Sequence, residues 1–168
     1  FWVQLPPTKS PVEPGARAYA RLREAQEQTL DLPATGQAIS IDLDASDTRE
    51  MGRRLALLAR NQSYGLPTDT SGPRFDRADR EGSALRVHFR FADNGLTAGG
   101  KPLQAFEIAG PDRVFHPATA SLQRATVVVS SPAVKEPVAL RYAWFNAPDA
   151  NLFNGAGLPA APFRTDDW

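Results

Sequence analysis

Hydrophobic and polar positions along the chain change their spacing near residue 65. Before that point, apolar runs at residues 1–5 and 37–43 alternate with two segments of helical periodicity. After it, short alternating runs are separated by turn residues. The pattern predicts strand–helix–strand–helix followed by an antiparallel β-sandwich.

The first helix is predicted from about Pro14 to Thr29. Proline suits the first turn of a helix, and Ala18, Leu22 and Ala25 fall on one stripe that we expect to face inward.

The second helix follows the strand at residues 37–43 almost at once. Asp47 or Thr48 can cap it, and Met51, Leu55 and Leu58 have helical spacing. A strand–helix–strand unit with short connections predicts parallel strands joined by a right-handed crossover. Two strands are too few for a stable parallel sheet, so we expect its remaining strands to come from elsewhere.

The second part begins with residues 66–84, which are rich in Pro, Gly, Asp and Arg and are predicted to be a connector. Alternation is strict over residues 85–91, which indicates a strand with one buried face. We expect the last segment, residues 151–168, to lie over another surface. Strands are predicted at residues 85–91, 103–108, 125–130 and 138–145.

Composition excludes several kinds of site. Nineteen basic and nineteen acidic residues balance, which gives no general attraction to nucleic acid or anionic lipid. The chain has no cysteine and only two histidines, so neither a thiolate metal site nor a cofactor is expected. No apolar run approaches membrane-spanning length. The chain starts without Met in an apolar strand, so we expect it to be part of a longer protein.

The two histidines have ordinary explanations. His88 lies in a strand between Val87 and Phe89, where it is expected on the solvent face. His116 lies near Asp112, as in a hydrolase dyad, but this spacing is also typical of a turn between strands.

The other candidate side chains are acids and aromatics. Asp42, Asp44 and Asp47 follow the second strand, where one of them could orient a catalytic histidine; the alternative is that Asp47 caps the helix and Asp44 is a solvated loop residue. Trp144 could stack on a sugar ring or pack in an interface, and Arg141 could contact substrate or pin the C-terminal segment.

Long motifs in the last third resemble the end of sialate O-acetylesterase-like carbohydrate esterases, and shorter ones match earlier in the chain in the same order. They are Val127–Pro132, Pro137–Trp144, Asn151–Asn154 and Gly157–Asp166, preceded by Phe1–Leu5, Leu22–Gln26, Gly52–Leu57, Tyr64–Gly65 and Ser71–Pro73.

This resemblance implies an SGNH-type hydrolase with a flavodoxin-like parallel sheet. Residues 1–65 would be the C-terminal part of the hydrolase domain, and residues 66–168 a β-sandwich whose tail packs back on it. The implied activity is removal of acetyl groups from sialic acid or from plant-wall glycans (xylan or xyloglucan) by a Ser-His-Asp mechanism, in the periplasm or after secretion. The implied partners are the acetylated sugar and the N-terminal half of the hydrolase domain.

The chain departs from this family in one loop. The family carries an Ile-His-Pro segment before the Gly-Arg-Arg-Leu-Ala helix, but only residues 44–51 separate Leu43 from Gly52 here, and they contain no histidine. We expect Asp44 and Asp47 to flank a catalytic loop that is missing from these residues. The alternative is that the loop is truly short and the protein is a non-catalytic carbohydrate-binding or structural β module.

Overall fold

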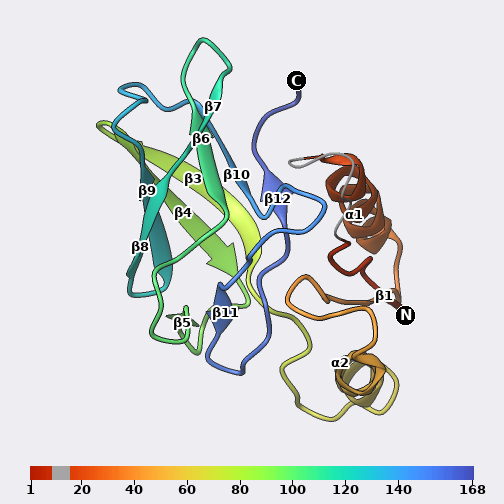
Figure 1. Ribbon diagram of the computed structural model, residues 1–168. Helices are drawn as coiled ribbons and strands as arrows, with labels where there is room; N and C mark the ends of the chain where they lie inside the picture. The colour runs from red at the N-terminus through yellow and green to blue at the C-terminus, as the bar shows by residue number, and fades with distance from the viewer. Residues whose placement is uncertain (9–15) are drawn as a thin grey trace.

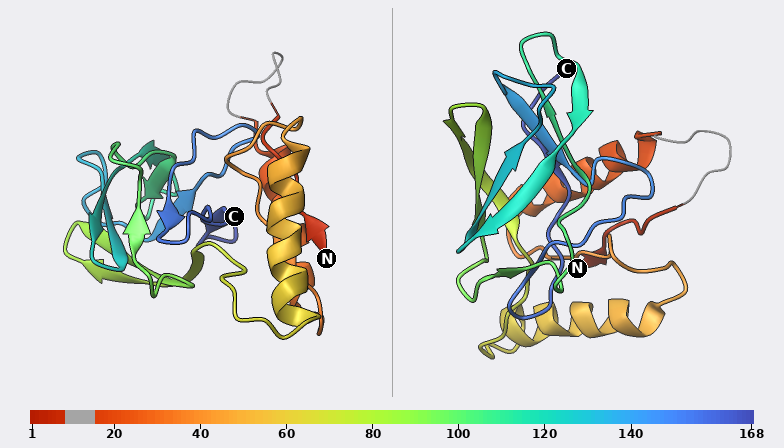
Figure 2. Two further views of the ribbon diagram at one scale, coloured as in Figure 1. Left: turned by 90° about the horizontal axis from the view of Figure 1, so that it is seen from below. Right: turned by 60° about the vertical axis from the view of Figure 1, so that its left-hand side comes forward.

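The computed structural model describes residues 1–8 and 16–168. The fold of these residues combines two α-helices with mostly antiparallel sheets. Strands β1 (Trp2–Val3) and β2 (Gln37–Ala38) pair in parallel, as the sequence predicted, although both are shorter than expected. Figures 1 and 2 show helices α1 (Ala18–Gln28) and α2 (Thr48–Gln62) on either side of this pair. No helix in the described residues is long and apolar enough to span a membrane.

Helix α1 presents a different face from the predicted one. The helix begins at Ala18 and is followed by a 3-10 turn at Thr29–Asp31; Pro14 lies outside the described residues. Its buried residues are Ala20 and Arg23, whereas Leu22 is 53% exposed, so the predicted inward stripe is wrong. The physical reason is that Arg23 turns inward, where its guanidinium donates to buried backbone carbonyls.

Helix α2 begins as predicted. The Asp47 side chain accepts a hydrogen bond from the Glu50 backbone N–H (3.3 Å), which satisfies one of the free donors of the first turn. Leu58 is buried, and so is Arg54, whose guanidinium binds acids on both sides.

The second part of the chain forms two four-stranded antiparallel sheets, ordered β3-β4-β9-β8 and β12-β10-β6-β7, and a small β5–β11 pair (Figure 1). The four predicted strands each overlap an observed one: β4, β6, β9 and β10. The bounds are β3 Arg74–Glu81, β4 Ala84–Arg90, β5 Leu96–Thr97, β6 Phe106–Ala109, β7 Phe115–Pro117, β8 Thr119–Gln123, β9 Thr126–Ser130, β10 Ala139–Tyr142, β11 Phe153–Asn154 and β12 Phe163–Arg164.

Strand β3 was not predicted, because it lies within the expected connector at residues 66–84. After Arg74 its residues are exposed or half-buried, so it carries few of the apolar positions that mark a strand. It is nevertheless a long edge strand paired with β4 over most of its length.

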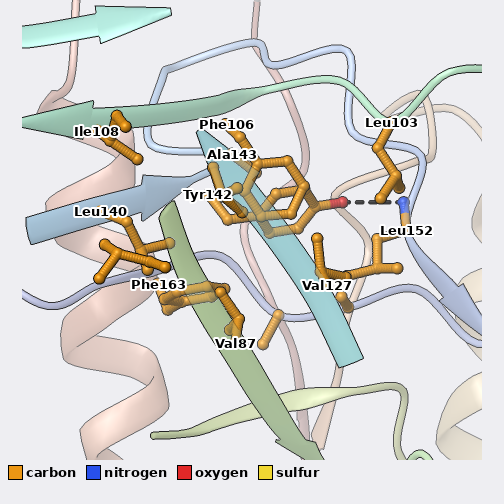
Figure 3. Close-up of a cluster of buried hydrophobic side chains, with 14 of the residues drawn as sticks. Val87, Leu103, Phe106, Ile108, Val127, Leu140, Tyr142, Ala143, Leu152 and Phe163 are labelled. Carbon is orange, nitrogen blue, oxygen red and sulfur yellow. Dashed lines mark hydrogen bonds between the residues drawn. The ribbon is translucent and has the colours of Figure 1, made fainter. Parts of the chain in front are cut away.

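The two sheets enclose one hydrophobic core, as in a β-sandwich (Figure 3). Tyr142 lies at its centre with no exposed surface, and its hydroxyl accepts a hydrogen bond from the Leu152 N–H (3.0 Å). Burial raises the pKa of Tyr142, so the hydroxyl stays neutral. Ile39 and Ile41, which follow β2, belong to the same core. The parallel pair is thus fixed against the sandwich by shared apolar packing.

The C-terminal segment returns across the molecule. Strand β12 pairs with β10, and the Arg164 Nε donates to Glu24 on α1 at 2.8 Å. The buried Asn154 side chain donates to the carbonyls of Ser71 (3.0 Å) and Phe91 (3.2 Å). These contacts tie the tail to α1 and to the strand ends of the sandwich.

Candidate functional site

A groove of about 520 Å³ lies at the carboxyl ends of β1 and β2. Three segments that are distant in the sequence form it: the residues after β1, those after β2, and a loop of the sandwich. Its lining residues are Pro7, Thr8, Ile41, Asp42, Leu43, Asp44, Ala45, Ala147, Pro148, Asp149 and Ala150. The carboxyl ends of parallel strands are the usual place for ligand sites in α/β sheets.

A second hollow, of about 440 Å³, lies at the opposite ends of the same strands. Gly36 and Gln37, at the start of β2, line it together with Arg74. Because this hollow is at the amino ends of the strands, the groove at the carboxyl ends is the stronger candidate for catalysis.

Asp42 anchors the groove to helix α2. Its carboxylate accepts two hydrogen bonds from Arg54, at 2.6 and 2.7 Å, and the same guanidinium donates to the Ile39 carbonyl (2.7 Å) and to Glu50 (2.9 Å). Burial alone would lower the pKa of Arg54, but its acidic partners Asp42 and Glu50 raise it. The arginine therefore stays charged and fixes the strand end on the helix.

The two predicted acids have different positions. Asp44 is exposed and lines the groove, and its Oδ1 accepts hydrogen bonds from the Ser46 N–H (2.9 Å) and hydroxyl (2.7 Å). Asp47 caps α2 and is not among the lining residues. Of the two, Asp44 is the one placed to act in the groove.

Neither histidine of the described chain lines this groove. His88 is half-buried in β4, and its Nε2 lies 3.0 Å from the Asp79 carboxylate. His116 lies in β7, at the end of the sandwich far from α2 (Figure 1). Asp112, its possible dyad partner, accepts a hydrogen bond from the Val114 N–H (3.1 Å) within a turn.

The structure gives Arg141 and Trp144 packing partners. Arg141 forms two hydrogen bonds with Asp166 in the tail, at 2.8 and 2.5 Å, and lies 3.8 Å above the Phe115 ring. Trp144 is only 3% exposed, and the Arg164 guanidinium lies 5.5 Å from its ring centre. Both side chains hold the tail in place, and neither lines the groove.

A buried arginine that sequence reasoning missed holds the groove together. Arg23 is 1% exposed and donates to four carbonyls: Leu5 (2.7 Å), Pro6 (2.9 Å), Phe145 (2.8 Å) and Asn146 (2.8 Å). Burial lowers the pKa of Arg23 to about 10, so it remains charged near neutral pH. Arginine on a helix normally faces water, and no local pattern marks this one as buried.

Asn146 completes this clasp, the name used here for Arg23 and Asn146 with their partners. Its backbone N–H donates to the Ala16 carbonyl (2.8 Å), its side-chain oxygen accepts from the Tyr19 N–H (2.9 Å), and its carbonyl accepts from the Thr8 N–H (3.1 Å). The clasp thus joins α1, the segment after β1 and the sandwich loop immediately beside the groove.

The groove has an acidic lining. Asp42, Asp44 and Asp149 line it, and no lysine or arginine of the described residues does. The chain offers no cluster of three or more His, Cys, Asp or Glu residues that could hold a metal ion, among the residues that the structure describes.

The chain therefore combines the end of a parallel α/β unit, with a groove at the carboxyl ends of its strands, and an antiparallel β-sandwich fixed to it. The fold is similar to the crystal structure of a carbohydrate acetylesterase from Xanthomonas citri, with a TM-score of 0.92 and 45% sequence identity. The match covers 99% of this chain and 41% of that one, so the chain spans about two fifths of the length of that esterase. No family model matches, and no curated protein does.

This similarity supports the relationship to carbohydrate esterases that the sequence motifs indicated. The narrower assignments to sialate esterases and to a flavodoxin-like SGNH fold go beyond it.

Proposed function

We propose that this chain is part of a carbohydrate O-acetylesterase. The observation that carries the proposal is the 45% identity to a carbohydrate acetylesterase over 99% of this chain. The position of the groove gives independent support, because it lies where α/β hydrolases place their catalytic groups, at the carboxyl ends of parallel strands.

The proposed fold of the whole protein is an SGNH-type hydrolase domain whose parallel sheet continues beyond β1 and β2. Two short strands do not form a stable parallel sheet alone, which supports further strands beside them. In this proposal residues 1–65 complete the hydrolase domain and residues 66–168 form the sandwich. The protein acts in the periplasm or outside the cell, where acetylated glycans occur.

The proposed reaction is serine-dependent ester hydrolysis. A serine hydroxyl attacks the acetyl carbonyl, a histidine takes the serine proton and passes it to the leaving sugar oxygen, and water then releases acetate from the acetyl-enzyme. The serine and the histidine come from parts of the protein outside these 168 residues. Asp44 is the acid of this chain best placed to orient the histidine, because it lines the groove next to the short loop.

Acetate release from a panel of acetylated sugars tests this proposal on the full-length protein. The panel holds O-acetylated sialic acid, acetylated xylan and acetylated xyloglucan, and p-nitrophenyl acetate is added as a simple ester without a sugar. We expect release from at least one sugar, and its loss after treatment with a fluorophosphonate that labels reactive serines. Asp44→Asn should lower the rate, whereas Asp167→Asn, an exposed change in the tail, should not. A folded protein that releases no acetate from any substrate would refute the proposal.

The short loop between Leu43 and Gly52 favours one alternative, a non-catalytic carbohydrate-binding or structural module. Burial of Trp144 removes the aromatic platform that sugar binding through this residue would need. Calorimetric titration with the same glycans distinguishes the possibilities, since binding without acetate release would favour the alternative.

A further inference from the structure

The third wall of the groove comes from the sandwich. Residues 147–150, here called the sandwich wall, face the residues that follow β1 and β2 across the groove. A sandwich that served only as a spacer would have no reason to reach the strand ends. This loop instead contributes four of the eleven lining residues.

The sandwich wall is held in a fixed position relative to the strand ends. Arg23 binds the carbonyls of Leu5 and Pro6 on one side of the groove and those of Phe145 and Asn146 on the other. A single buried side chain thus spans both walls, and all four of these hydrogen bonds are shorter than 3.0 Å. Fixing both walls in this way preorganises the groove for its substrate.

The carboxylates of the groove differ in how far they are engaged. Asp42 is bound by Arg54 and Asp44 by Ser46. Asp149 is exposed, and its side chain makes no hydrogen bond or ion pair with the described residues. A carboxylate in this state accepts hydrogen bonds from hydroxyl groups and repels other carboxylates.

We propose that Asp149 determines the sugar specificity of the groove, by accepting hydrogen bonds from sugar hydroxyls and by repelling acidic sugars. The Arg23 clasp acts as the positioning element that holds Asp149 against the strand ends. This inference rests on the proposed esterase function and adds to it the residue that discriminates neutral from acidic substrates.

The test compares kcat/KM of the full-length protein for an acetylated xylo-oligosaccharide, which is neutral, with that for O-acetylated sialic acid. Asp149→Asn keeps an acceptor but removes the charge, so kcat/KM for the sialic acid should rise about fourfold, as expected for two charges roughly 5 Å apart in water. Asp149→Ala removes both properties, and kcat/KM for the neutral substrate should fall about tenfold. Asp167→Ala is the matched control and should change neither value.

The salt dependence of kcat/KM and the activity on p-nitrophenyl acetate separate a failure of this inference from a failure of the proposed esterase function. Added salt should narrow the gap between the two substrates in the wild type, because screening weakens charge repulsion. Unchanged selectivity in both Asp149 variants, or a wild-type preference for the sialic acid, would overturn the inference while leaving the esterase function intact. Absence of acetate release from every substrate, p-nitrophenyl acetate included, would instead overturn the proposed function and this inference with it.

The role of the clasp is tested by combining a substitution in the clasp with a substitution of Asp149 and measuring whether their effects on selectivity add. The quantity compared is kcat/KM for the neutral xylo-oligosaccharide divided by kcat/KM for O-acetylated sialic acid. In an Arg23→Lys background, Asp149→Ala should change this ratio by less than threefold, because Asp149 is no longer held in place. If Arg23→Lys does not fold, Asn146→Ala loosens the same loop through the Tyr19 contact. Full additivity in a folded variant would show that the clasp stabilises the fold without positioning Asp149.

Discussion

Replacing Arg23 with methionine should destabilise the protein by about 3–5 kcal/mol. The change removes four hydrogen bonds of 2.7–2.9 Å at a site with 1% exposure. The Asn146 carbonyl keeps a backbone donor, but those of Leu5 and Phe145 lose the only hydrogen bond that they have in the described chain. Each buried carbonyl without a partner costs roughly 1–3 kcal/mol.

Two opposing contributions set the final value. Removing the buried guanidinium relieves its desolvation, which is large enough to lower the pKa of Arg23 to about 10. The partners of Arg23 are neutral carbonyls, so its removal leaves no unpaired buried charge. Two carbonyls without a donor cost roughly 1–3 kcal/mol each, and the expected loss of about 3–5 kcal/mol lies within their sum. A domain with an ordinary stability of roughly 5–15 kcal/mol would lose a large share of it.

Urea unfolding followed by the fluorescence of the three tryptophans measures this loss. The midpoint should fall while the slope stays the same, since the variant removes contacts without changing the surface exposed on unfolding. Arg21→Met is the matched control, because Arg21 lies on the same helix and is exposed, and it should change stability by less than about 0.5 kcal/mol. A loss below about 1 kcal/mol for Arg23→Met would refute the structural role assigned to the clasp.

Three other predictions concern stability and are checked by the same unfolding assay. The pKa of Glu50 is lowered from 4.5 to about 2, first by its hydrogen bond to Arg53, so its contribution is present above pH 4.5 and is lost as the pH falls toward 2; Glu50→Gln should flatten this part of the acid profile. Gly72→Ala should cost more than about 2 kcal/mol because the added Cβ meets backbone atoms, whereas Gly52→Ala, in open space on α2, should stabilise by about 0.5–1 kcal/mol. Tyr142→Phe should cost about 1–3 kcal/mol, because it leaves a buried amide without its acceptor.

Features encoded by neighbouring residues were predictable from the sequence. The cap at Asp47 depends on a contact three residues away, and the alternating pattern of β4 shows directly which face is buried. The parallel pairing of β1 and β2 followed from the strand–helix–strand order. Each of these features is local or follows from chain topology, which is why a single sequence sufficed.

Features that depend on distant contacts were not predictable. Arg23 is buried only because carbonyls from residues 5–6 and 145–146 meet around it, more than 100 residues apart in the chain. Strand β3 lacks an apolar pattern because most of it is an exposed edge. The sandwich wall at residues 147–150 reaches the groove by tertiary packing, so no local pattern could show that Asp149 lines the same groove as Asp42 and Asp44.

The proposal that this chain is part of an enzyme that deacetylates carbohydrates is tested most directly by the initial rate of acetate release from an acetylated oligosaccharide, measured before and after fluorophosphonate treatment. The account predicts steady release that the reagent abolishes, with the label on a serine outside residues 1–168. Release that resists the reagent would contradict the serine mechanism, and a folded protein that releases no acetate would contradict the function itself.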